Sequence, residues 1–159
     1  MVVVSDTTAI TNLLKVKLLL IIKGLYGQIL VPQAVYDELA TLSAQKKIID
    51  SQKWIKVVEI QNQVLYEKLR ESLDKGESEA IVLALELDSD FLIIDEAKGR
   101  KIARSYGIRI IGLLGILVLA KEEGLISQIK PYLKELRDKM GFRVSDKLYE
   151  QILSQVGEI

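Results

Sequence analysis

Two acidic residues follow directly after short apolar runs, at points where a strand is expected to end. Asp6 closes the run at residues 2–5, and Asp95 closes the run at residues 91–94. Continuous, β-branched apolar runs of this length are typical of buried parallel strands. Because ligands of open α/β sheets bind beyond the carboxyl ends of the strands, we expect both carboxylates at one sheet edge. This pair predicts a divalent-cation site.

A third acid, Glu38, lies on or beside the apolar stripe of the helix expected after Pro32. The stripe consists of Val35, Leu39 and Leu42, and Glu38 follows Val35 by three residues. A carboxylate turned inward without a partner is costly, so an inward Glu38 needs a partner such as a metal ion. At the edge of the stripe, the Glu38 side chain would reach solvent instead. The sequence does not decide between these two placements.

Glu77 and Glu79 lie in the first turn of an almost wholly apolar helix expected at 77–87. Acids in a first turn complement the helix dipole, and this explanation suits both residues equally. However, the apolar remainder indicates a helix buried on most sides. An acid at its start can therefore face an enclosed cleft.

Helix capping is the structural alternative for the acids at the strand ends. Asp6 can cap the helix that follows it, and Asp95 or Glu96 can cap the helix expected near Ala97. Capping and metal binding are compatible for Asp6. Parallel topology can bring the acids at strand ends and in the first helical turns to one edge of the sheet.

The composition restricts the available chemistry. The chain contains neither cysteine nor histidine, which excludes disulfides, zinc–thiolate sites, imidazole ligands and a Ser-His-Asp triad. Hydrolysis must therefore rest on carboxylates, lysine, hydroxyls or metal-bound water. An all-oxygen site favours Mg²⁺ or Mn²⁺ over zinc.

The charge is balanced overall, with 22 basic and 22 acidic residues, so net charge does not favour a nucleic-acid partner. The distribution of charge favours such a partner weakly, because Lys98, Arg100 and Lys101 follow Asp95 closely. A basic patch beside an acidic site suits a phosphodiester substrate. A solvated helix face explains the same residues equally well.

Strand and helix signals alternate along the chain, which predicts an α/β fold with a parallel sheet covered by helices. Strands are expected at 2–5, 28–31, 54–60, 91–94 and 108–111. Helices are expected at 9–23, from Pro32 to Leu42, and at 44–52, 62–73, 77–87, 97–106, 113–123, 126–139 and 145–156. Gly24 and Gly27 are expected to break the chain after the first helix.

We expect one domain over residues 1–125, with residues 126–159 forming a helical C-terminal extension packed on it. The apolar fraction of 49% suits a large core. No apolar stretch reaches membrane-spanning length, and the N-terminal apolar run is too short for a signal peptide. A cytoplasmic protein is the expected class.

Four segments together resemble the acidic blocks of PIN domains. They are Val-Val-Ser-Asp-Thr-Thr-Ala-Ile at 3–10, Val-Pro-x-x-Val-x-x-Glu-Leu at 31–39, Glu-Ala-Ile-x-Leu-Ala at 79–84 and Leu-Ile-Ile-Asp at 92–95. The order and spacing agree over about residues 2–125. The later segments at 107–117, 129–133 and 141–145 are similar to one poorly characterised PIN-like branch, often encoded beside small antitoxins.

The resemblance implies a three-layer α/β/α fold and a metal-dependent ribonuclease acting on single-stranded or structured RNA. In many relatives this enzyme is the toxin of a toxin–antitoxin module, and the resemblance implies an antitoxin partner and a homodimer. It assigns four acids to catalysis and to Mg²⁺ or Mn²⁺. Two further acids are possible additional ligands, and the resemblance also places a hydroxyl near the site. Apart from the resemblance, the basic segment after Asp95 offers three cations that could hold the scissile backbone. These residues are, in that order, Asp6, Glu38, Glu79 and Asp95; Glu77 and Glu96; Thr7; and Lys98, Arg100 and Lys101.

The fourth acidic block departs from the common pattern. PIN domains usually have a hydroxyl residue after the strand and an acid two positions later, whereas position 97 is Ala. Asp95 or Glu96 must therefore substitute. This departure keeps open a catalytically inactive PIN-like module that binds nucleic acid or protein.

A phosphoryl-transfer protein is a further alternative, because such proteins also need an acid after the first strand. Haloacid-dehalogenase phosphatases have a second Asp two residues later, where this chain has Thr8. Receivers have an acidic pair before their phospho-accepting Asp, whereas Asp6 comes first. No Gly-rich phosphate loop is present.

Overall fold

Five parallel strands form a single sheet in the computed structural model, which describes residues 1–159. The strands are β1 (Val3–Ser5), β2 (Ile29–Pro32), β3 (Ile55–Val58), β4 (Phe91–Ile93) and β5 (Ile110–Ile111). Their order is β3-β2-β1-β4-β5, and every neighbouring pair is parallel. The predicted α/β fold with a parallel sheet is confirmed.

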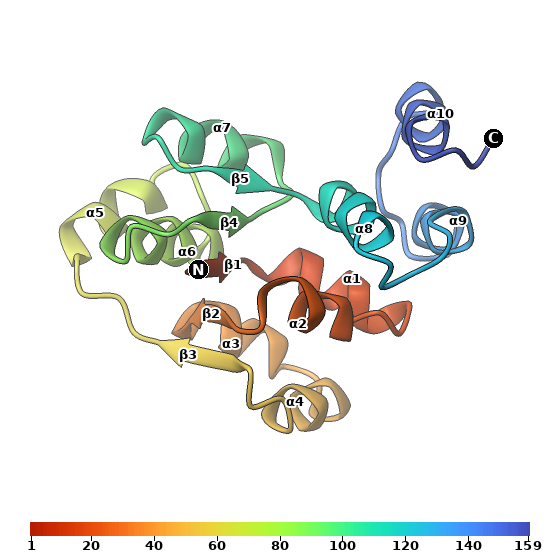
Figure 1. The fold of residues 1–159 in the computed structure, drawn as a ribbon. Coiled ribbons are helices and arrows are strands. Elements are labelled where there is room, and N and C mark those ends of the chain that lie inside the picture. The colour runs from red at the N-terminus through yellow and green to blue at the C-terminus, as the bar shows by residue number, and fades with distance from the viewer.

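Ten helices surround the sheet and continue beyond it (Figure 1). They are α1 (Thr7–Lys15), α2 (Leu20–Tyr26), α3 (Gln33–Leu39), α4 (Ser43–Asp50), α5 (Gln63–Arg70), α6 (Lys75–Glu86), α7 (Ala97–Ser105), α8 (Leu113–Glu122), α9 (Lys130–Lys139) and α10 (Asp146–Gln155). No helix has the length and apolar character needed to cross a membrane.

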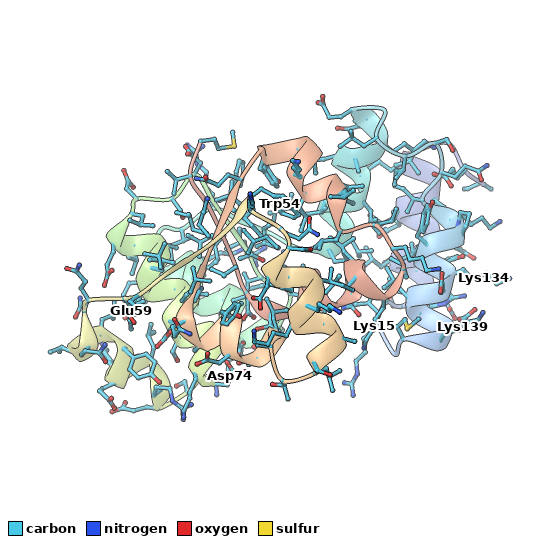
Figure 2. All side chains as sticks on the ribbon, turned by 90° about the horizontal axis from the view of Figure 1, so that it is seen from below. Lys15, Trp54, Glu59, Asp74, Lys134 and Lys139 are labelled. Carbon is cyan, nitrogen blue, oxygen red and sulfur yellow. The ribbon has the colours of Figure 1, made fainter.

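The sheet has a hydrophobic core on each face. Side chains alternate between faces along a strand, so Val3 belongs to one core and Val4 to the other. The larger core is filled from α1, α2, α3, α8 and α9, and the smaller one from α5, α6 and α7. Charged side chains such as Glu59, Asp74 and Lys134 lie on the outside (Figure 2). The result is the three-layer arrangement that the resemblance implies.

The register of β1 and β4 brings their carboxyl ends together. Val4 of β1 pairs with both Leu30 of β2 and Leu92 of β4. Just beyond the strands, the Asp6 N–H donates to the Ile93 carbonyl at 2.9 Å. The two segments that carry Asp6 and Asp95 are therefore neighbours at one sheet edge.

The single helix predicted at 9–23 is wrong, because the chain forms α1 and α2 with a turn between them. Lys17 adopts a left-handed conformation (φ 61°) that stops α1. Gly24, expected to break the chain, lies inside α2, where a Cβ would be 2.8 Å from Leu125. It permits close packing of the helix rather than a turn. Gly27 does end α2, at a φ of 75°.

The C-terminal helices pack against the rest of the chain. The helix predicted at 126–139 begins later, at Lys130, and Pro131 occupies its first turn. Leu133 and Leu136 of α9 are fully buried in the larger core. Figure 1 shows α9 and α10 beside α8, on the side of the molecule away from α5.

Candidate metal centre

Asp6 is the most deeply placed acid at the carboxyl edge of the sheet. It occupies the N-cap position of α1, but its side chain makes no capping hydrogen bond, and only 5% of the residue is exposed. Burial raises the pKa of Asp6 from 3.8 to about 7, and nearby negative charges on Asp74, Glu38 and Asp95 add to this effect. A buried acid without a cap bond requires another explanation.

Glu38 reaches the same place from α3, although it is exposed rather than turned into the core. Its Oε2 accepts a hydrogen bond from Thr7 Oγ1 at 2.7 Å. A Cβ on Gly76 would lie 2.5 Å from Glu38 Oε1 and 3.4 Å from Asp6 Oδ1. The Asp6 and Glu38 carboxylates therefore converge on the first turn of α6, at a position without a side chain.

The two acids at the start of α6 have different surroundings. Glu77 is 7% exposed, and its buried Oε2 has no hydrogen-bond partner. Burial, followed by the nearby carboxylates of Asp74, Glu96 and Asp6, raises the pKa of Glu77 far above its usual value. In contrast, Glu79 Oε1 accepts a hydrogen bond from the Ala34 N–H at 2.8 Å, at the start of α3. The structure brings Glu77 to Asp6 and directs Glu79 elsewhere.

Asp74 is an acid near this cluster that sequence reasoning missed. Its Oδ1 accepts a hydrogen bond from the Glu77 N–H at 2.8 Å and caps α6. The sequence signal was available, because Asp74 and Glu77 have the spacing of a capping box.

Asp95 and Glu96 separate into two roles. Asp95 Oδ1 accepts a hydrogen bond from the Leu113 N–H at 2.9 Å, whereas its buried Oδ2 has no partner. Burial raises the pKa of Asp95, opposed by the Leu113 hydrogen bond and the Arg100 charge. Glu96 caps α7 through the Gly99 N–H at 2.8 Å, which lowers the pKa of Glu96.

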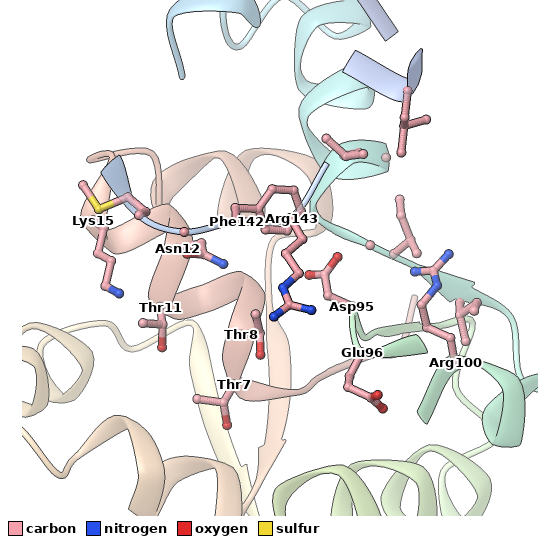
Figure 3. A pocket seen from close by; sticks show the side chains of 18 of the residues that line it. Thr7, Thr8, Thr11, Asn12, Lys15, Asp95, Glu96, Arg100, Phe142 and Arg143 are labelled. Carbon is pink, nitrogen blue, oxygen red and sulfur yellow. The ribbon is translucent and has the colours of Figure 1, made fainter. Parts of the chain in front are cut away.

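A cleft of about 1050 Å³ is lined by Glu38, Asp95 and Glu96, and Figure 3 shows it from close by. One wall is a polar face of α1, formed by Thr7, Thr8, Thr11, Asn12 and Lys15. These residues recur at helical spacing, so the sequence contained a signal for this face. The opposite wall includes Asp95, Glu96 and Arg100. The lining also contains Arg143, from the connection between α9 and α10, which sequence reasoning did not select.

Of the three cations expected to bind substrate, only Arg100 lines this cleft. Its Nη1 donates to the Ile94 carbonyl at 2.8 Å, so the guanidinium is held against the end of β4. Lys98 and Lys101 are exposed on α7 and are not part of the lining. The cleft therefore draws its other cations from α1 and from the C-terminal extension.

The fold and the acidic cleft agree with a family comparison. A family model described as a PIN domain matches residues 2–158. The chain belongs to the PIN-domain family. The match extends over α9 and α10, so the C-terminal helices fall within it. Among curated proteins, none matches the chain.

PIN domains are usually nucleases, and those nucleases generally use divalent metal ions. The residues of this PIN domain fit such an ion. The available ligands are all carboxylate oxygens, and the buried oxygens Glu77 Oε2 and Asp95 Oδ2 lack partners. No three acidic side chains form a ready-made ligand set in this structure. Binding of an ion would therefore require these side chains to rotate toward one another.

Proposed function

We propose that this PIN domain is a metal-dependent ribonuclease that cleaves single-stranded or structured RNA. The observation that carries the proposal is the convergence of the Asp6 and Glu38 carboxylates on Gly76, with Glu77 and Asp95 among the acids near Asp6. Asp6 is held buried with a pKa raised to about 7. Such a group is costly to the fold and indicates a functional site.

Asp6, Glu38, Glu77 and Asp95 would hold Mg²⁺ or Mn²⁺, with Asp74 and Glu96 beside them. When bound, the ion would activate a water and neutralise charge developing on the phosphodiester.

The chain's other groups orient these ligands. The Thr7 hydroxyl donates to Glu38 and fixes one carboxylate. The Leu113 N–H fixes Asp95 and leaves its second oxygen available. Because orienting partners outside the ligand set strongly affect metal affinity, Thr7 has a positioning role.

We assign the third acid to Glu77 rather than to Glu79, the residue selected by resemblance. Both lie at the start of α6, but only Glu77 has an unpartnered buried oxygen and only Glu77 is among the neighbours of Asp6. The Glu79 carboxylate satisfies the Ala34 N–H. Glu79 therefore has a structural role at the start of α3.

A cleavage assay with this pair of acids tests the proposal. Purified protein is incubated with end-labelled single-stranded RNA in Mn²⁺, Mg²⁺ or EDTA. We expect Glu77→Gln to lower cleavage by about 100-fold or more, as Asp6→Asn and Glu38→Gln also do, since even outer-shell partners are worth about 10–100-fold. The matched variant Glu79→Gln should retain cleavage, because its amide oxygen still accepts from Ala34. Full activity in Asp6→Asn would refute the assignment.

A catalytically inactive binding module is the second candidate. It is favoured by the absence of a ready-made three-acid ligand set and by Ala97 in the fourth block. In the same assay this candidate predicts RNA binding without cleavage in either metal.

More specifically, we propose that the protein is a toxin that has a small antitoxin partner and assembles as a homodimer. The family resemblance supports this part of the proposal. Induced expression of the wild-type chain should then arrest growth, and Asp6→Asn should not. Light scattering measures the assembly. Equal growth with both proteins would count against the toxin role.

A further inference from the structure

Arg143 is held over the acidic cleft by the connection between α9 and α10. Its neighbours Phe142 and Val144 pack against the larger core, whereas Arg143 is exposed and lines the cleft. Figure 3 shows its guanidinium reaching between Thr8 and Asp95. This in–out–in alternation anchors the segment on both sides and directs the cation toward the acids.

The connection is fixed by specific contacts at both ends. The Phe142 N–H donates to the Leu136 carbonyl at 2.9 Å, and Ser145 caps α10. The Arg137 guanidinium lies 4.0 Å from the centroid of the Tyr149 ring and links α9 to α10. The position of Arg143 is therefore built into the extension.

The negative charge of the acids beside the cleft indicates what kind of ligand the Arg143 guanidinium would bind. The acids of the cluster repel a phosphodiester, so an anionic substrate needs cations beside them. Arg100 is held by the Ile94 carbonyl, while none of the ion pairs uses Arg143. Lys15, also exposed, lines the cleft along α1 (Figure 3). Arg143 and Lys15 are the cations of the cleft lining that make no side-chain hydrogen bond or ion pair within the protein.

We propose that Arg143, assisted by Lys15, binds the phosphate backbone of single-stranded RNA across the acid cluster. This inference rests on the proposed function and makes the C-terminal extension part of the substrate site. Apolar side chains of Phe142, Met140 and Leu114 also line the cleft. Such surfaces suit unpaired bases, whereas the faces of bases in a duplex are stacked on one another.

Fluorescence anisotropy with a labelled single-stranded RNA tests this role in an Asp6→Asn background with Mg²⁺, where the proposal predicts no cleavage. We expect Arg143→Ala to weaken binding about tenfold and to reduce the slope of log affinity against log salt by about 0.7, one phosphate contact. Arg143→Lys should retain most of the slope. Lys147→Ala is the matched control, because Lys147 is an exposed cation of α10 outside the cleft lining. Circular dichroism verifies the fold of each variant.

In the otherwise wild-type chain, Arg143→Ala should raise KM for RNA cleavage with little change in kcat. Unchanged binding and KM in Arg143→Ala would overturn the inference while leaving an active ribonuclease intact. Tighter binding or faster cleavage would also overturn it, because Arg143 would then be closing the cleft. A wild-type chain that neither binds nor cleaves RNA would overturn both this inference and the proposed function.

Discussion

At the scale of single residues, the ionised form of Asp6 is unfavourable in the folded protein without metal. Its pKa rises from 3.8 to about 7 because burial and neighbouring carboxylates disfavour the charge. Between these values the folded state binds a proton that the unfolded state has lost. The free energy of unfolding therefore falls as pH rises through this window. Each pKa unit is worth about 1.4 kcal/mol, so the loss amounts to a few kcal/mol.

Asp6→Asn removes this charge and should stabilise the protein in EDTA. We expect the variant to exceed the wild type by a few kcal/mol at pH 8 and by much less at pH 4.5, where folded Asp6 is protonated. Urea denaturation at the two pH values measures the difference. Asp90→Asn serves as a control, because Asp90 is an exposed acid that accepts from the Val2 N–H away from the cluster. A less stable Asp6→Asn at pH 8 would contradict this account.

The sequence identified some of the candidate residues but could not choose between close neighbours. Asp6 was recognisable because a buried strand ends at it. Glu77 and Glu79 both lie near the polar N-terminal end of α6, so the sequence does not show which of them faces the site. They differ in the structure because α3 packs against α6 and its Ala34 N–H binds Glu79. Arg143 was not recognisable as a cleft residue, because its place depends on how the α9–α10 connection packs beside the cleft.

At the scale of elements, the first turn of α6 lacks a side chain where the Asp6 and Glu38 carboxylates converge. A Cβ on Gly76 would meet Glu38 Oε1 at 2.5 Å. Because Glu38 is exposed and the contact involves only the far end of its side chain, the carboxylate can turn aside without disrupting α6. Alanine also favours a helix interior over glycine by about 1 kcal/mol.

We therefore expect Gly76→Ala to keep or raise the melting temperature in EDTA while weakening Mn²⁺ binding. Calorimetric titration measures the affinity, and a tenfold loss is the expected order. Lys75→Ala, on the same turn but exposed, should leave the affinity unchanged. If Gly76→Ala binds Mn²⁺ with the wild-type affinity, the Asp6 and Glu38 carboxylates do not bind the ion beside the first turn of α6.

Most elements were predictable because buried strands and amphipathic helices follow simple periodicities. The break between α1 and α2 was not, because the apolar spacing continues through both helices while Lys17 turns the chain. The prediction that Gly24 breaks the chain was wrong for a related reason. Its role is to admit Leu125, a residue a hundred positions away, and no local pattern contains that contact.

At the scale of the whole molecule, Glu158 fastens the C-terminus to the start of α9. Its carboxylate accepts hydrogen bonds from the Ile129 and Lys130 N–H groups and from Lys121 Nζ, at 2.8–2.9 Å. Burial acts to raise the pKa of Glu158, but these donors outweigh it and hold the pKa below its usual value. The contribution to stability is therefore present at neutral pH and is lost as pH falls below the usual range.

Glu158→Gln should lower the free energy of unfolding by about 1–3 kcal/mol at pH 7, since it weakens charge-assisted hydrogen bonds. The difference should shrink by pH 3.5, when the wild-type carboxylate is protonated. Urea denaturation measures both values, and Glu150→Gln on the exposed side of α10 is the control. A difference that persists at pH 3.5 would exclude the charge as its cause.

We propose that the extension at 126–159 and the domain at 1–125 unfold as one unit. Ile129, Leu133 and Leu136 share the larger core with α1 and α8, so separating the extension would expose that core. Denaturation should show a single transition when followed both by circular dichroism and by the fluorescence of Trp54. Two transitions would show that the extension is a separate unit.

The central claim, that Asp6 and its neighbours hold a divalent cation, is tested most directly by melting temperature against Mn²⁺ concentration. Wild type and Asp6→Asn are compared in a metal-free buffer at neutral pH and then titrated. An ion at about 100 times its dissociation constant adds about 2.7 kcal/mol, so the wild type should gain roughly 5–10 °C. Asp6→Asn should start higher and gain little. No rise in the wild type, or an equal rise in both proteins, would contradict the account.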